Sequence, residues 1–166
     1  MKSRKTLRMK IIMTVPQSKL SRLRRVRADC LVLVTRRAGM AALAAVTPLP
    51  GLDLGMTLVL VPEMLSAINR KFGLTPEQIS RLPLRRQGRL LEIAAHLGNQ
   101  AIGRAVTRQT VKLLLRQLGV KISLKTAARI VPIAGNVAAG AISFSTIKML
   151  GTRHVNACYE VRRRLL

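Results

Sequence analysis

The stretch AAVTPLPG at residues 44–51 decides the expected fold class, because it recurs as ARIVPIAG at residues 128–135. The offset is 84 residues (44 to 128), and in both copies a proline stands three positions before the glycine. Proline and glycine interrupt helices and favour turns. The pair predicts a duplicated helical hairpin with a Pro-x-x-Gly apex, with a chance match of two apolar segments as the alternative. The residues assigned to the two turns are Pro48, Pro50, Gly51, Pro132 and Gly135.

The segments around these turns are apolar and almost free of charge. Residues 38–62 carry only Asp53, and residues 130–147 carry no charged side chain. The first segment is long enough by count to cross a bilayer, but its turn leaves a first arm, residues 38–47, of only about 15 Å. Small residues after each turn are typical of closely packed helices. The candidates for such packing are Gly55, Ala139, Gly140 and Ser143.

Local signals divide the rest of the chain into helices. Gly73 is placed to end one helix, and Thr75 and Gln78 form a capping box around Pro76 that starts the next. Gly151 is placed to end the second hairpin. The expected segments are hairpin one at about 31–69, basic linker helices at about 75–121 (with a long helix over 85–118), hairpin two at about 123–150 and a basic C-terminal helix at about 151–166.

The first residues of the chain form a strongly basic segment. Residues 1–27 contain ten basic residues and no acidic one, and their apolar stretch is too short for a secretory signal. We expect residues 1–19 to be a flexible arm and residues 20–166 to form a single helical domain. The fold class predicted is therefore an all-α bundle that contains the two duplicated hairpins. A soluble bundle in which the hairpins form the buried core is the structural alternative to a membrane-associated one.

The composition restricts the class of partner. The chain has 30 Lys and Arg against 6 Asp and Glu, a net charge of +24, and 49% of its residues are apolar while 2% are aromatic. A charge this large calls for a polyanion, either nucleic acid or an anionic membrane surface. The scarcity of stacking aromatics disfavours nucleic acid. Basic residues cluster before, between and after the hairpins, so hairpins that dip into a membrane and return would hold all three clusters on the cytoplasmic side. The residues assigned to anionic-surface contacts are Arg22, Arg24, Arg25, Arg27, Arg104, Arg108, Lys112, Arg116, Arg162, Arg163 and Arg164.

Two acidic residues lie within the most apolar stretch, Asp53 and Glu63. An acid in a membrane segment is a candidate for a functional role, either neutralising an arginine or lining a polar path. The alternatives are a helix-dipole contact for Asp53, which falls in the first turn after Gly51, and an interfacial surface position for Glu63.

Catalytic and metal-binding patterns are missing from the sequence. No pair of acids has the spacing of a general acid–base couple, and His96 and His154 are isolated. Cys30 and Cys158 belong to no metal-ligand spacing. No GxxxxGK[ST] phosphate-binding loop occurs. We therefore expect no enzyme activity, no cofactor and no metal.

The apolar motifs resemble a known family. Residues 42–55, FGLTP at 72–76, AARIVPIAGN at 127–136 and GAIS at 140–143 are similar to the YcjF-type membrane domain associated with Era-like GTPases, and EcsC-like proteins share related stretches. The resemblance covers roughly residues 38–160. It implies membrane association and a link to a GTPase, which would be a separate partner because this chain lacks a G domain.

The function expected from these patterns is that of a non-enzymatic protein that binds or inserts in the cytoplasmic membrane and recruits a partner such as a GTPase. Anionic lipids are the expected ligands, and self-association is left open. A pore-forming or membrane-perturbing effector is the first alternative. A basic nucleic-acid-binding protein is the second.

Overall fold

The computed structural model describes residues 17–47, 52–99, 101–104, 106–107, 109–111, 113 and 134–166, with residues 17, 52–56 and 134–136 described by their backbone alone. This part of the chain contains helices and no strand, which confirms the predicted all-α class. The helices are α2 (Gln17–Val46), α3 (Leu52–Phe72), α4 (Pro76–Ser80), α5 (Leu84–His96) and α7 (Ala134–Arg164).

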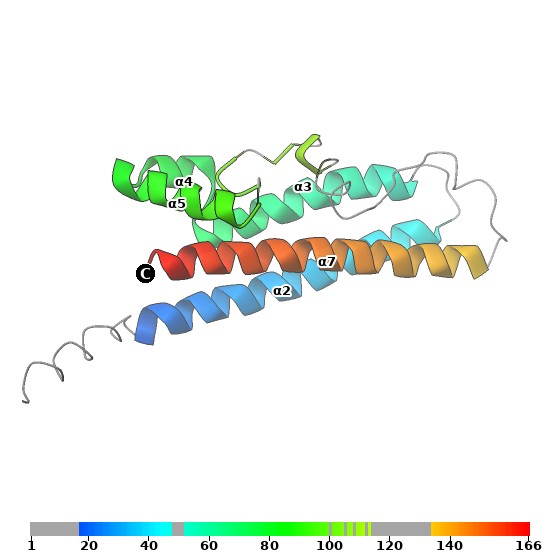
Figure 1. The fold of residues 1–166 in the computed structure, drawn as a ribbon. Coiled ribbons are helices and arrows are strands. Elements are labelled where there is room, and N and C mark those ends of the chain that lie inside the picture. Colours follow the sequence, from blue (N-terminus) through cyan, green and yellow to red (C-terminus); the bar gives the residue numbers. More distant parts are fainter. Residues whose placement is uncertain are drawn as a thin grey trace, which may run out of the picture.

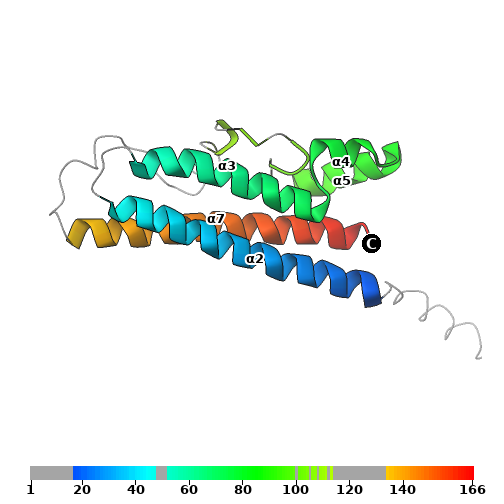
Figure 2. The ribbon, with the colours of Figure 1, turned by 180° about the vertical axis from the view of Figure 1, so that it is seen from behind.

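Two long helices form the axis of the molecule. α2 and α7 lie antiparallel and side by side along most of their length, and α3 runs beside them (Figure 1, Figure 2). The end of α2, the start of α3 and the start of α7 lie at one end of the bundle. The short helices α4 and α5 lie at the other end, together with the start of α2 and the C-terminus (Figure 1).

The core follows from the helical period of the apolar residues. In α2 the buried side chains recur every three or four residues, at Cys30, Val34, Ala38 and Ala41, and so form one face. A fully buried aliphatic side chain contributes about 1.5–3 kcal/mol relative to an exposed one. Facing this stripe are fully or nearly fully buried residues of α3 and α7, namely Val61, Met64, Leu65, Ile68, Ile147, Val155, Cys158 and Val161.

Glycines bring α7 close to its neighbours. A Cβ atom on Gly140 would lie 2.7 Å from Cγ2 of Val46, and one on Gly151 would lie 2.7 Å from both methyl carbons of Val34. The prediction that Gly151 ends a helix is wrong, because α7 continues through it to Arg164. The absent side chain at Gly151 serves the contact between two helices, so residues 151–166 do not form a separate helix.

Glycine ends two other helices, α3 and α5. Gly73 has a φ of 69°, and the N–H of Leu74 donates to the carbonyl of Asn69 at 2.8 Å, which is the Schellman arrangement. The predicted capping box at Thr75 and Gln78 is confirmed by both reciprocal hydrogen bonds.

The expected long helix over residues 85–118 is wrong. α5 ends at His96, because Gly98 adopts a φ of 63° and the N–H of Asn99 donates to the carbonyl of Ala94 at 3.2 Å. This second Schellman motif turns the chain away from the helix axis. Arg104 therefore lies on an exposed bend and not within that helix. Arg108, Lys112 and Arg116, which were expected on the same helix, lie outside the described residues.

The termini of the hairpin segments also differ from expectation. α2 begins at Gln17 and continues unbroken to Val46, so Ser18 and Lys19 are helical and the helix that precedes Pro48 is longer than expected. Gly135 lies in the first turn of α7, where its N–H needs no partner within the helix, and not in a turn before it. Pro48, Pro50, Gly51, Pro132 and the first half of hairpin two lie outside the described residues.

Candidate functional site

One end of the bundle carries no charge on its described side chains. Residues 38–46 of α2, 57–62 of α3 and 137–147 of α7 contain no Asp, Glu, Lys or Arg. Large aliphatic side chains nevertheless face outward here, with Leu43 72% exposed and Val137 and Ile142 each 65% exposed. We call this region the apolar end, with Met40, Leu43, Val46, Val59, Val137 and Ile142 as its exposed large apolar residues. Exposed apolar clusters of this kind are found at protein–protein interfaces, membrane interaction sites and ligand-binding grooves.

A shallow hollow of about 550 Å³ lies between α2 and α7 at the apolar end. Leu43 and Val46 line it from α2, and Val137 and Phe144 line it from α7. Gly140 forms part of its floor, and the Oγ of Ser143 donates to the carbonyl of Ala41 at 3.5 Å. Of the predicted packing residues, Gly140 and Ser143 thus lie at the α2–α7 contact, Ala139 is half-buried beside them, and the surroundings of Gly55 lie outside the described residues.

Charged residues from three helices bound the apolar end at one level of the bundle. Nη1 of Arg37 lies 3.5 Å from Oε2 of Glu63, which joins α2 to α3. Nζ of Lys148 donates to Oγ1 of Thr35 at 2.6 Å, which joins α7 to α2. We call Arg36, Arg37, Glu63 and Lys148 the charged girdle. Glu63 is therefore an exposed partner of an arginine at this boundary, whereas Asp53 is the second residue of α3 and its side chain lies outside the described set.

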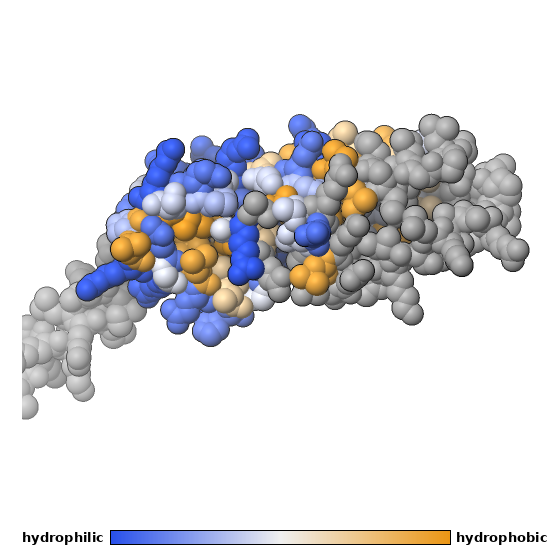
Figure 3. Space-filling model, turned by 90° about the horizontal axis from the view of Figure 1, so that it is seen from above, coloured by the Kyte–Doolittle hydropathy of each residue, from blue (hydrophilic) through white to orange (hydrophobic). Residues whose placement is uncertain are grey.

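Beyond the girdle the surface is strongly basic. Figure 3 shows hydrophilic side chains gathered over the α4–α5 end of the molecule, with apolar side chains between them. Arg22, Arg24 and Arg25 are exposed on α2. Their assignment to contacts with an anionic surface stays a prediction. We call this region the basic end.

Other basic residues that were assigned to contacts with an anionic surface form hydrogen bonds within the protein. Nη2 of Arg27 donates to Oδ1 of Asn156 at 2.8 Å, and its guanidinium lies 5.1 Å from the ring centre of Tyr159. Arg163 and Arg164 both donate to Glu160, and these hydrogen bonds hold the pKa of the Glu160 carboxyl at about 2. Their charge is thus partly compensated on the surface of α7.

A buried polar cluster connects α7, α3 and the turn after α5. Nε2 of His154 lies 2.9 Å from Oδ1 of Asn69, and Nδ1 of His154 lies 2.9 Å from Nδ2 of Asn99. Nδ2 of Asn69 donates to the carbonyl of Ala101 at 2.7 Å, and Sγ of Cys158 lies 3.6 Å from Asn69 Oδ1. This cluster is not apparent from the sequence, since its members are isolated along the chain and the only local signal is the four-residue helical spacing of His154 and Cys158.

The cluster is structural in character. Burial lowers the pKa of His154 to about 4, so the imidazole is neutral at pH 7. Burial also raises the pKa of the Cys158 thiol and raises that of Cys30 to about 11. Neither thiol is ionised at neutral pH or exposed to solvent, so neither has the properties of a nucleophile.

Two further properties of the described residues concern metal binding and membrane spanning. Among residues that the structure describes, no group of three or more His, Cys, Asp or Glu side chains is arranged to hold a metal ion. Within the same part of the chain, no helix combines the length and the apolar character needed to cross a bilayer.

Comparison of the chain with protein-family models, curated proteins and solved structures finds no match. The resemblance to YcjF-type and EcsC-like proteins therefore stays a prediction.

Proposed function

We propose that the protein is a non-enzymatic membrane-associated protein whose apolar end enters one leaflet of a bilayer and whose basic end faces the cytoplasm. One observation carries this proposal. Exposed aliphatic side chains gather at the apolar end, where the described residues carry no charge, and the charged girdle marks the limit of this end. Exposure of this apolar surface to water costs free energy, whereas its burial in lipid hydrocarbon is favourable.

The dimensions of the apolar end fit one leaflet. At a rise of 1.5 Å per residue, residues 38–46 of α2 extend about 14 Å beyond the girdle, and residues 134–147 of α7 extend about 21 Å. The hydrocarbon core of a bilayer is about 30 Å thick, so the α2 length matches half of it, and the α7 length exceeds half by roughly 6 Å but stays short of the full thickness. A structure of this size enters the membrane and returns without crossing it, which agrees with the absence of a spanning helix among the described residues.

The charges support the same orientation. Insertion to the girdle places Arg36, Arg37 and Lys148 at the level of the lipid headgroups, where a basic side chain near an anionic surface contributes about 1 kcal/mol. The cytoplasmic leaflet is the more anionic one, and basic segments remain on its side. The basic end then projects away from the lipid, where it is accessible to a partner, such as the separate GTPase that the resemblance implies.

The proposal is tested by placing a charge on the apolar end. In Leu43→Lys and Ile142→Lys, an ammonium group replaces a side chain that is more than half exposed, so the fold should tolerate both changes. We expect each to lower co-sedimentation with vesicles of 30% phosphatidylserine in phosphatidylcholine by about tenfold, because a lysine in the apolar layer costs roughly 2.5–3.5 kcal/mol at its centre and less near its edge.

Leu84→Lys is the matched control. Leu84 is 83% exposed, but it lies on α5 at the basic end. Its variant adds the same positive charge and should bind vesicles at least as well as the unmodified protein. Equal loss in all three variants, or no loss in any, contradicts the proposal.

A vesicle-leakage assay distinguishes this function from pore formation. A protein that enters only one leaflet should bind vesicles loaded with a self-quenched dye without releasing the dye. Rapid release at protein concentrations that give partial binding supports a pore-forming effector and contradicts a scaffold.

A further inference from the structure

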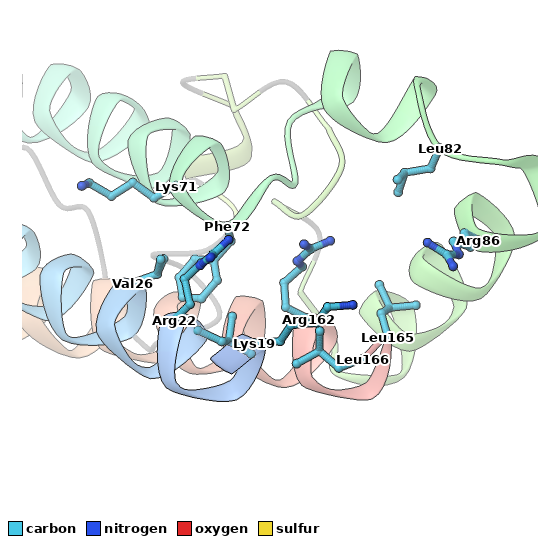
Figure 4. A pocket seen from close by; sticks show the side chains of 11 residues that line it. Lys19, Arg22, Val26, Lys71, Phe72, Leu82, Arg86, Arg162, Leu165 and Leu166 are labelled. Carbon is cyan, nitrogen blue, oxygen red and sulfur yellow. The ribbon is translucent and has the colours of Figure 1, made fainter. Parts of the chain in front are cut away.

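The basic end contains a groove that the membrane function does not use. Its volume is about 450 Å³, and it opens where the start of α2, the end of α3, the turn before α5 and the end of α7 meet (Figure 4). We call it the basic groove. Five cationic side chains from four helices line it, and none of the described lining side chains is acidic; the cations are Lys19, Arg22, Lys71, Arg86 and Arg162.

The groove also has an apolar wall. Leu23 and Val26 contribute to it from α2, Phe72 from α3, and Leu82 and Leu165 from the segments that follow α4 and α7. Leu23 and Phe72 are buried, whereas Val26, Leu82 and Leu165 are half-buried and accessible to a ligand. Concentrated positive charge thus lies directly beside apolar surface in one hollow.

Arg162 is half-buried, whereas the other four cations of the groove are exposed. Its two neighbours, Arg163 and Arg164, share the carboxylate of Glu160 on another side of α7. Arg162 turns into the groove, where none of the described residues forms an ion pair with it, and its partial burial lowers the pKa of the guanidinium. A half-buried guanidinium without a carboxylate partner is stabilised by an anion that supplies oxygens for its planar fork of donors.

We propose that the basic groove binds a phosphate monoester that carries an apolar chain. A phosphate presents several oxygens and close to two negative charges in one small volume, so it satisfies several converging cations at once. The apolar chain then lies against Val26, Leu82 and Leu165. Binding pockets for small molecules have volumes of about 300–1,000 Å³, which includes this one.

Charge excludes two other occupants. Residues 1–16 of the chain contain Lys2, Arg4, Lys5, Arg8 and Lys10 and no acid, so the groove repels them. A second copy of the chain carries the same net charge of +24 and presents few carboxylates. An acidic peptide supplies a single charge per side chain over a longer span, which matches a compact cluster of five cations less well.

The ligand has two sources, a free molecule or a lipid of the same headgroup chemistry in a bilayer. The groove lies about 21 Å along α7 from the girdle, taken as the distance from Lys148 to Arg162 at 1.5 Å per residue. A protein inserted by its apolar end therefore holds the groove away from that bilayer. The proposal does not depend on insertion, since its test uses a soluble ligand.

The test is titration calorimetry with octyl phosphate below its micelle concentration, in 0.15 M salt. We expect the full chain to bind octyl phosphate at least about tenfold more tightly than inorganic phosphate, because burial of the chain adds to the ionic contacts. Leu82→Asn should weaken octyl phosphate binding and leave binding of inorganic phosphate unchanged. Vesicles that contain phosphatidic acid, added in competition, report whether a bilayer lipid reaches the same site.

Charge-matched variants distinguish the groove from general attraction to a basic protein. Arg22→Gln and Arg162→Gln should each weaken binding of octyl phosphate by about tenfold, which is the loss of one charge-assisted contact. Arg24→Gln and Arg153→Gln remove the same charge from exposed sites of α2 and α7 outside the groove, so they should change binding by less than about twofold. Circular dichroism spectra establish that all four variants are folded.

Three results overturn the proposal. These are no measurable binding of octyl phosphate, an equal loss in the groove variants and their controls, or tighter binding of a glutamate-rich decapeptide than of octyl phosphate. The last result identifies the groove as a docking site for an acidic segment of another protein.

Discussion

His154 of α7 donates a hydrogen bond from Nε2 to Oδ1 of Asn69 in α3, at 2.9 Å, in the interior of the bundle. Because the amide oxygen only accepts, this geometry assigns the proton of the neutral imidazole to Nε2, and Nδ1 accepts from Nδ2 of Asn99 at 2.9 Å. All three side chains are satisfied, and no buried side-chain nitrogen or oxygen of the described residues lacks a partner. The cluster therefore fixes the position of α3 and of the turn after α5 relative to α7.

The stability of the protein should fall as the pH is lowered through the range in which His154 becomes charged. Burial lowers the folded-state pKa of His154 from 6.5 to about 4. The unfolded state therefore binds a proton near pH 6.5 that the folded state does not, so stability is full above pH 6.5 and declines toward pH 4. We expect the free energy of unfolding to be about 2 kcal/mol lower at pH 5 than at pH 7, measured by urea denaturation.

His154→Gln provides the control for this pH effect. The variant should be less stable than the unmodified protein at pH 7, because its side chain does not reproduce both hydrogen bonds of the imidazole. Its stability should change much less between pH 7 and pH 5. A variant that retains the full pH dependence would show that other groups cause it.

The Gly151→Ala substitution should destabilise the protein. Its new methyl group would meet both methyl carbons of Val34 at 2.7 Å and Cε of Met64 at 3.1 Å, and Val34 is completely buried. Overpacking of this kind costs about 1–3 kcal/mol, which exceeds the gain of roughly 1 kcal/mol in helix propensity. Gly88→Ala in α5 meets nothing within 4 Å, so it should stabilise the protein by about 0.5–1 kcal/mol. Thermal denaturation of both variants checks the opposite signs, and stabilisation by both would refute the close approach.

The cysteines should resist modification in the native protein. Cys30 and Cys158 are fully buried, and burial raises the pKa of the Cys30 thiol to about 11. The thiolate is the reactive species, so a disulfide reagent at pH 8 should modify both cysteines quickly in guanidinium chloride and very slowly without it. Rapid modification of the native protein would contradict the burial of the α2–α7 interface.

The sequence predicted features that depend on a few neighbouring residues. Gly73 as a helix end and the capping box of Thr75 and Gln78 both follow from hydrogen bonds within one turn of chain. The same local rules failed at Gly151, which packs against a valine of a helix more than 100 residues earlier in the chain. A glycine that ends a helix and one that admits a neighbour look alike in sequence, and only the tertiary contact separates them.

The functional surfaces likewise combine residues that local sequence signals identify with residues that only the tertiary structure brings together. Arg22 and Arg162 were assigned from the sequence to contacts with an anionic surface, and that assignment stays a prediction. In the structure both line the basic groove, where Lys71 and Arg86 join them only because four helices meet at the basic end. Asn69, Asn99 and His154 were equally inaccessible to local reasoning, because their hydrogen bonds join residues that lie far apart in the chain. Glu63 was assigned to the membrane or its interface, and its pairing with Arg37 places it at the girdle.

The central claim, that the apolar end enters one leaflet, is tested most directly by the depth of labels along the bundle. Single cysteines replace Leu43 at the apolar end, Arg36 at the girdle and Leu84 at the basic end, and each carries an environment-sensitive fluorophore, since the buried native cysteines do not react. With vesicles of brominated lipids, we predict strong quenching at position 43, weaker quenching at position 36 and none at position 84. Equal quenching at positions 43 and 84, or quenching at position 84 alone, would contradict the account.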